Sequence, residues 1–191
     1  MIINICYSCD NNYAKYLGVA IQSVVENASS ENTYNIYVLD GGISDTNKVK
    51  LNKLATQNCN IIYTDMYSLK KEYELDKLPL GQHITTAAYF RIFIEKLFPD
   101  IERIIYLDCD TYFMCDPANF YNIDLGDKLM GVVRDIGLLY QRGKGKFDYK
   151  YYKKIIGLED YDNYFNSGVL LYDLKNIRNY QGKSLINIMQ E

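Results

Sequence analysis

The sequence has 191 residues, a formal net charge of −3 and a pI near 5.3. This length fits one domain, and with 48% hydrophobic and 14% aromatic residues the chain can bury a sizeable core, which excludes an intrinsically disordered protein. The acidic charge gives no general attraction to nucleic acid or anionic lipid. No apolar run approaches the roughly 20 residues that span a bilayer. No basic segment precedes the first apolar residues, so we expect a cytoplasmic protein without a secretory signal.

Strand and helix patterns alternate in the first third of the chain. In order, they predict a buried strand at Ile2–Tyr7, a turn or N-cap at Asp10–Asn12, a helix from Tyr13, a strand at Tyr34–Leu39, a turn at Asp40–Gly42, a helix capped by Ser44 and a strand at Asn60–Thr64. This alternation implies a parallel sheet with right-handed crossovers.

The second part of the chain repeats this logic less regularly. It predicts a buried helix at Thr85–Leu97, strands at Arg103–Leu107, Met130–Arg134 and Ser167–Tyr172, and short helices at Lys175–Tyr180 and Ser184–Gln190. A polar stretch rich in Gly and Lys, Asp135–Asn163, separates two of these strands. We therefore expect an open α/β sheet, mainly parallel and flanked by helices, with residues 1–191 forming one domain.

Two polar clusters follow predicted strands. Ligands bind open α/β sheets beyond the carboxyl ends of the strands, and both Asp10–Asn12 and Asp108–Asp110 fall at such ends. Asp108 and Asp110 are two residues apart, so period-two geometry turns both carboxylates to one side while Cys109 points away. Two adjacent carboxylates repel unless a cation lies between them, and oxygen ligands favour Mg²⁺ or Mn²⁺. A turn with solvated Asp side chains has the same spacing.

Other readings of these carboxylates fit less well. An EF-hand starting at Asp108 requires Gly at its sixth position and Glu at its twelfth, where this chain has Phe113 and Asn119. A haloacid-dehalogenase-like phosphotransferase requires Thr at the fifth position, where this chain has Tyr112.

The five cysteines do not indicate a redox or zinc protein. Cys6 and Cys9 have the spacing of a redox motif, but Cys6 falls inside a predicted strand and not at a helix N-terminus, so small buried apolar residues are the better interpretation. With His83 as the single histidine, a structural zinc site is improbable.

The segment Tyr140–Lys154 is basic and aromatic. Its Gly143–Lys146 run lacks the spacing of a P-loop, and the surrounding charge is acidic, which disfavours nucleic-acid binding. We expect a solvated surface loop or a flap over a ligand site.

Five segments together resemble glycosyltransferase family 8, whose members have the GT-A fold, a Rossmann-like architecture. They occur in the family's order across nearly the whole chain: Asp10–Ala14, Val38–Ser44, Thr85–Ile92, Tyr106–Thr111 and Tyr164–Leu171. A lone Asp-x-Asp is weak evidence, whereas five ordered segments are strong evidence.

The resemblance implies roles for residues after the first strand and for the acidic pair. Asp10 would accept a hydrogen bond from the uracil imide, Tyr13 would pack on the uracil ring, and Asn12 would frame that pocket. Asp108 would contact the ribose or donor sugar and bind Mn²⁺ or Mg²⁺ together with Asp110, with Cys109 bordering the donor. A tyrosine that covers core has the same spacing as Tyr13.

Other roles follow from the later segments. Arg91 would reach the donor sugar or its diphosphate, although an arginine in a helix often pairs with a neighbouring acid. Asn166 and Ser167 would line the sugar-phosphate site, or form a turn. Asp135 matches a carboxylate near the family's reaction centre, and is also an ordinary turn residue.

The implied reaction moves a hexose from UDP-glucose or UDP-galactose to the hydroxyl of a glycan or lipid-linked sugar, with retention of configuration, by either a covalent or a same-face route. Family members also have a downstream Asp-Gln pair and a later metal-binding histidine, which have no match before Glu191. We therefore expect weak cation affinity and little transfer by residues 1–191 alone, and association with the inner membrane face only through a part beyond them. A non-catalytic nucleotide-sugar-binding module is the alternative.

Overall fold

The computed structural model describes residues 1–78, 85–145, 148–154, 157–158, 164–180 and 184–190. Its strands are β1 (Ile2–Cys9), β2 (Thr33–Asp40), β3 (Cys59–Asp65), β4 (Arg103–Leu107), β5 (Met130–Arg134) and β6 (Phe165–Asp173). Each strand matches a prediction, with ends that shift by up to two residues for some of them. The alternation of apolar side chains therefore located the sheet correctly.

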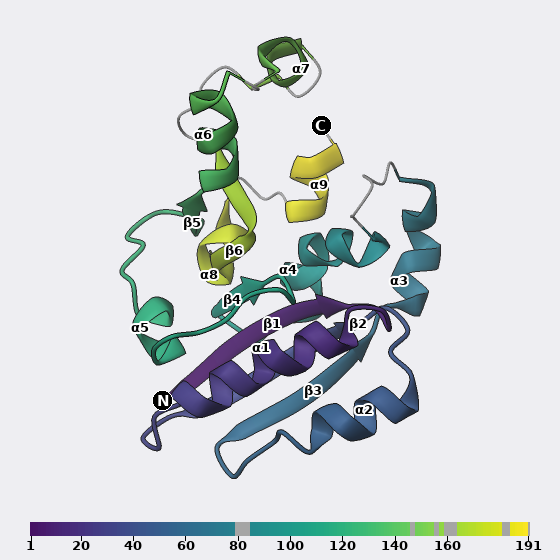
Figure 1. Ribbon diagram of the computed structural model, residues 1–191, viewed down its shortest axis with the longest axis vertical. Helices are drawn as coiled ribbons and strands as arrows, with labels where there is room; N and C mark the ends of the chain where they lie inside the picture. The colour runs from purple at the N-terminus through teal and green to yellow at the C-terminus, as the bar shows by residue number, and fades with distance from the viewer. Residues whose placement is uncertain (79–84, 146–147, 155–156, 159–163, 181–183, 191) are drawn as a thin grey trace.

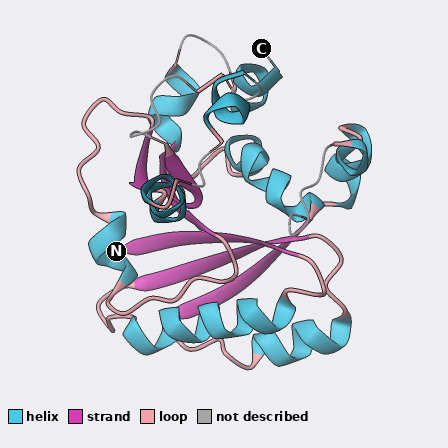
Figure 2. Ribbon diagram, turned by 45° about the horizontal axis from the view of Figure 1, so that its top comes forward, coloured by secondary structure: helices cyan, strands magenta, loops and turns pink. Residues whose placement is uncertain are grey.

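The strands form one sheet in the order β3-β2-β1-β4-β6-β5 (Figures 1 and 2). Neighbours from β3 to β4 pair in parallel, whereas β6 is antiparallel to both β4 and β5. The chain builds outward from β1 to β3 and then crosses to β4 on the other side of β1. The strand order thus reverses between β1 and β4, and ligands bind at such a switch point.

Helices cover both faces of the sheet. They are α1 (Ala14–Asn27), α2 (Asp45–Asn52), α3 (Tyr67–Glu72), α4 (Ile94–Leu97), α5 (Pro117–Tyr121), α6 (Ile136–Gly143), α7 (Tyr149–Lys154), α8 (Leu174–Asn179) and α9 (Leu185–Gln190), with 3₁₀ helices η1 (Leu75–Lys77) and η2 (Thr86–Phe93). Helices α1 and α2 lie side by side on one face (Figure 2), whereas η2, α4 and α8 pack on the other. Among the described residues, no helix is long and apolar enough to cross a membrane.

Alternation along β1 divides the core between these faces. Ile3, Ile5, Tyr7 and Cys9 pack toward α1, whereas Cys6 packs with η2 and α4. Cys6 and Cys9 therefore lie on opposite faces, both fully buried. Burial raises the pKa of the Cys6 thiol well above its ordinary value. This confirms the interpretation of both cysteines as small core residues.

The buried helix predicted over Thr85–Leu97 is present, and most of it is a 3₁₀ helix. Residues Thr86–Phe93 form a 3₁₀ helix, and only Ile94–Leu97 are α-helical. The buried side chains of the first part are Ala87, Phe90 and Phe93. They recur every three residues, which is the period of a 3₁₀ helix, so one row of side chains faces the sheet.

Several short helices were not predicted. The stretch from Asp135, expected as a loop, contains α6 and α7 within its described part. Asp135 caps α6 by accepting a hydrogen bond from the Leu138 amide at 2.8 Å. Asp116 caps α5 in the same way through Ala118, with Pro117 at the first helical position. The predicted cap at Ser44 is confirmed, because its hydroxyl accepts from the Asn47 amide.

Candidate active site

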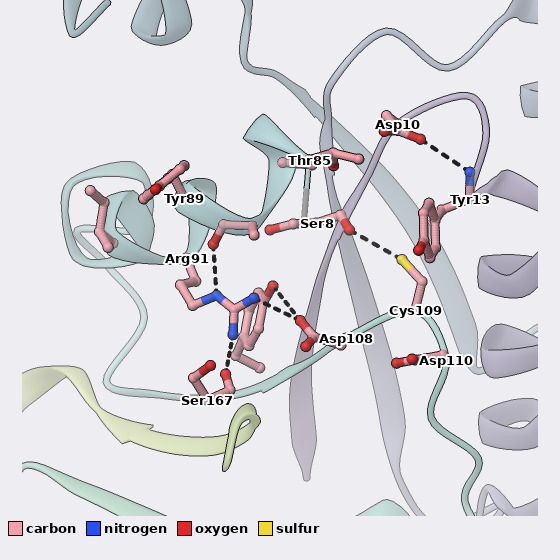
Figure 3. A pocket seen from close by; sticks show the side chains of 14 residues that line it. Ser8, Asp10, Tyr13, Thr85, Tyr89, Arg91, Asp108, Cys109, Asp110 and Ser167 are labelled. Atoms are coloured by element: carbon pink, nitrogen blue, oxygen red, sulfur yellow. Dashed lines mark hydrogen bonds and ion pairs between the residues drawn. The ribbon is translucent and has the colours of Figure 1, made fainter. Parts of the chain in front are cut away.

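A cleft of about 450 Å³ opens at the switch point between β1 and β4. Ligand pockets commonly have about 300–1,000 Å³, so this volume accommodates a nucleotide-sized molecule. The cleft is lined by the end of β1, by the η2 segment, by the loop after β4 and by Ser167 of β6 (Figure 3). Parallel strands that end at the same sheet edge thus bring together segments far apart in the sequence.

The turn after β1 supplies Asp10 and Tyr13 to this cleft. Asp10 Oδ1 accepts hydrogen bonds from the amides of Asn12 at 2.9 Å and Tyr13 at 3.1 Å. One carboxylate oxygen therefore holds the turn that leads into α1, and no described hydrogen bond uses Oδ2. Asn12 is exposed and does not line the cleft.

Arg91 connects three segments at the floor of the cleft. Its Nε donates to the Ala88 carbonyl at 2.7 Å, one terminal nitrogen donates to the Ser167 carbonyl, and Nη2 pairs with Asp108 Oδ1 at 2.9 Å (Figure 3). Its guanidinium carbon also lies 4.6 Å from the centre of the Tyr106 ring, in cation–π geometry. With the side chain only 13% exposed, Arg91 joins η2, β4 and β6 at this point.

Asp108 receives a second donor from its own strand. The Tyr106 hydroxyl donates to Asp108 Oδ1 at 3.0 Å. Burial raises the pKa of Tyr106 well above its usual range, so the hydroxyl keeps its proton and acts as a donor. The Asp108 side chain is still 40% exposed, and no described hydrogen bond uses its other oxygen, Oδ2.

The loop after β4 carries Asp110 two residues beyond Asp108. Both side chains line the cleft, and Asp110 is exposed (Figure 3). Cys109 between them is buried, and its thiol donates to the Ser8 carbonyl at 3.1 Å. A hydrogen bond with Cys9, together with burial, strongly raises the pKa of the Cys109 thiol. Asp108 and Asp110 share the cleft as expected, but Cys109 borders it too, and β4 itself ends at Leu107, so these residues do not alternate as in a strand.

The donor chemistry fits a hard divalent cation in part. Asp108 Oδ2 and the Asp110 carboxylate offer oxygen ligands, and Gly168, which has no Cβ, leaves room beside Oδ2. Within the described residues, no group of three or more His, Cys, Asp or Glu side chains could hold a metal ion. The two carboxylates are therefore an incomplete set of ligands. His83 lies outside the described residues.

The remaining predicted site residues are more dispersed. The Asn166 side chain accepts a hydrogen bond from the Gly168 amide at 2.6 Å and, like Asp135, does not line the cleft. Ser167 does line it, and its carbonyl holds Arg91. The sequence interpretation missed Ser8 and Tyr106. Tyr106 could have been found from its spacing, since residues two apart in a strand share a face.

The chain matches the glycosyl transferase family 8 profile over residues 4–189. It is 30% identical to General stress protein A of Bacillus subtilis over 100% of this chain and 63% of that protein. It is also 30% identical to the lipopolysaccharide 1,2-glucosyltransferase of Escherichia coli, over 91% and 48% of the two chains. A crystal structure of galactosyltransferase LgtC with donor and acceptor sugar analogues superposes with a TM-score of 0.72 at 31% identity, over 94% of this chain and 60% of that one.

These likenesses define the class of the protein. The central sheet and its flanking helices are those of a GT-A glycosyltransferase fold. The chain belongs to glycosyl transferase family 8. It spans about half to two thirds of the length of the relatives that it matches.

Proposed function

We propose that this chain forms the donor-binding part of a hexosyltransferase, which takes glucose or galactose from a UDP-sugar and transfers it, with retention of configuration, to an acceptor hydroxyl. One observation carries the proposal. The cleft at the β1/β4 switch point has Asp10 and Tyr13 on the β1 side and Arg91, Asp108 and Asp110 on the other. A flat ring beside a carboxylate acceptor suits a uracil base, and paired carboxylates suit a metal-bound diphosphate.

Each of these five residues has a role in the proposed reaction. The Tyr13 ring packs on the base, and the free oxygen of Asp10 accepts a hydrogen bond from the imide N–H of the base. Asp108, through Oδ2, and Asp110 hold Mn²⁺ or Mg²⁺. When bound, such an ion neutralises charge that develops on the departing diphosphate. Arg91 fixes Asp108 and Ser167 at the sugar end, and its cationic group adds positive potential there.

The acceptor is proposed from two of the related proteins. LgtC was crystallised with donor and acceptor sugar analogues, and one relative is named a lipopolysaccharide glucosyltransferase. By analogy, we propose a glycan or lipid-linked sugar as the acceptor, used at the cytoplasmic face of a membrane. Asp135 lies at the start of α6, outside the cleft, so any role near the reacting carbon requires movement of that helix.

Calorimetry of UDP binding with and without Mn²⁺ tests this function. We expect binding that Mn²⁺ strengthens, a loss of this strengthening in Asp110→Ala, and no competition from GDP or ADP. Asp124→Ala is a matched control, because it removes an exposed carboxylate that does not line the cleft. Equal affinity for UDP with and without Mn²⁺ in the wild type would contradict the metal-dependent proposal.

A second measurement separates an enzyme from a binding module. Hydrolysis of UDP-glucose and UDP-galactose is followed by UDP release with Mn²⁺ present. Because the described residues contain no group of three or more side chains that could hold a metal ion, we expect slow turnover. Metal-coupled UDP binding without any turnover would favour the non-catalytic module.

A further inference from the structure

Two donors converge on a single oxygen of Asp108. The Tyr106 hydroxyl lies 3.0 Å and Arg91 Nη2 2.9 Å from Oδ1. These donors come from different elements, β4 and η2, so they reach the carboxylate from separate parts of the chain. No described hydrogen bond uses Oδ2, which faces the backbone of Gly168.

We propose that Tyr106 is a positioning residue, whose hydroxyl fixes the plane of the Asp108 carboxylate and thereby presents Oδ2 to the cation. This inference rests on the proposed function, because it assigns the orientation of a carboxylate in the same site. Tyr106 is fully buried and its hydroxyl donates to Asp108, so we assign it no direct contact with the cation.

A second donor is needed because the terminal torsion of an aspartate is soft. Its rotamers are broad and nearly two-fold, so one hydrogen bond allows the carboxylate to pivot about the shared oxygen. Two donors on Oδ1 restrict that pivot. Partners that orient a ligating carboxylate in this way commonly change metal affinity by about 10–100-fold when removed.

Tyr106 also holds the other donor in place. The Arg91 guanidinium lies over its ring, and Nε and the second terminal nitrogen are fixed by the carbonyls of Ala88 and Ser167. A Phe at position 106 keeps the ring, and therefore the support for Arg91, while it removes the hydroxyl alone. Tyr106→Phe thus separates orientation of Asp108 from packing of the core.

The neighbouring strand provides a matched control. Tyr7 is as fully buried as Tyr106 and packs toward α1, and no described hydrogen bond joins its hydroxyl to the Asp108 carboxylate. Tyr7→Phe removes the same atom from the adjacent strand and leaves both donors to Asp108 Oδ1 in place.

The experiment compares wild type, Tyr106→Phe, Tyr7→Phe and Asp110→Ala in two ways. Crystal structures without metal report the orientation of the Asp108 carboxylate, and electron paramagnetic resonance of Mn²⁺ reports cation affinity at saturating UDP. We expect one orientation in wild type and Tyr7→Phe, two in Tyr106→Phe, and a Mn²⁺ affinity about 10-fold weaker in Tyr106→Phe alone among the tyrosine variants.

The outcomes distinguish this inference from the proposed function. A Tyr106→Phe variant with one carboxylate orientation or with wild-type Mn²⁺ affinity overturns the inference and leaves the function standing. A tighter Mn²⁺ complex also overturns it, because the hydroxyl would then act by withdrawing charge. If wild type and Asp110→Ala bind Mn²⁺ equally poorly, the proposed function fails and the inference falls with it.

Discussion

Gly168 lies directly against the carboxylate of Asp108. A Cβ added at Gly168 would overlap Asp108 Oδ2 and would lie 2.9 Å from its Cγ. The same glycine accepts a hydrogen bond from the Asp108 amide at 2.9 Å through its carbonyl. The antiparallel strand β6 therefore determines the space around the acidic side chain that follows β4, and only glycine leaves Oδ2 free to bind a ligand.

Gly168→Ala should accordingly damage the site and not the fold. The φ of Gly168 is not in the left-handed region, so alanine is acceptable to the backbone, and the added methyl group displaces the carboxylate. We expect Mn²⁺-dependent UDP affinity to fall by at least about 10-fold, as measured by calorimetry. Gly18→Ala in α1, whose Cβ would make only an ordinary contact, is the control and should raise stability by about 1 kcal/mol. Unchanged UDP affinity in Gly168→Ala would show that the Asp108 carboxylate can move aside without weakening Mn²⁺-dependent binding, and would contradict the prediction.

Arg91→Lys should lower both stability and affinity, although it conserves charge. Lysine cannot reach the Ala88 and Ser167 carbonyls and Asp108 at the same time, because its donors are grouped at one atom. Leaving one part-buried partner unsatisfied costs about 1–3 kcal/mol, which urea unfolding can measure. The exposed Arg134→Lys is the control and should change stability by less than about 0.5 kcal/mol. Equal losses of unfolding free energy in Arg91→Lys and Arg134→Lys would contradict the prediction, because the three contacts of Arg91 would then contribute nothing specific.

Much of this arrangement could be predicted from the sequence because strands have a strict period. Alternating apolar residues located β1 and β4, and the polar residues that follow them, Asp10 and Asp108, lie at one sheet edge as expected. The strand order that reverses between these strands then brings them to one cleft. The strand pattern and the strand order therefore both place Asp10 and Asp108 at this cleft.

The remaining features depend on contacts that local patterns do not contain. The apolar segment around Phe90 fits either helical type by composition, and only its packing on the sheet selects the three-residue repeat. Asp135 looked the same as an active-site carboxylate, but its hydrogen bond to Leu138 caps a helix that the polar sequence did not indicate. The pairing of Arg91 with Ser167 joins residues far apart in the chain, which no spacing rule relates.

Stability should fall at alkaline pH through the buried tyrosines. Burial raises the pKa of Tyr7, Tyr34, Tyr106 and Tyr172, so the folded state keeps protons that the unfolded state releases near pH 10. This contribution is fully present below about pH 9 and is lost as the pH rises above about 10. Urea unfolding between pH 7 and 11, together with tyrosinate absorbance, should show that part of the 20 tyrosines ionise only on unfolding. Ionisation of all of them near pH 10 in the folded protein would contradict this expectation.

Thiol reactivity provides a direct check on the core. Cys115 is exposed, whereas Cys6, Cys9, Cys59 and Cys109 are buried. A thiol in an apolar environment is a poor nucleophile, because burial disfavours the thiolate, as the raised pKa of Cys6 and Cys109 indicates. An aromatic disulfide reagent should therefore modify about one thiol quickly in the folded protein and all five in denaturant. Cys115→Ser should remove the fast phase. A fast phase that persists in this variant would mean that a second thiol is accessible in the folded protein, and Cys109, which borders the cleft beside Asp108 and Asp110, would be the first to replace by serine.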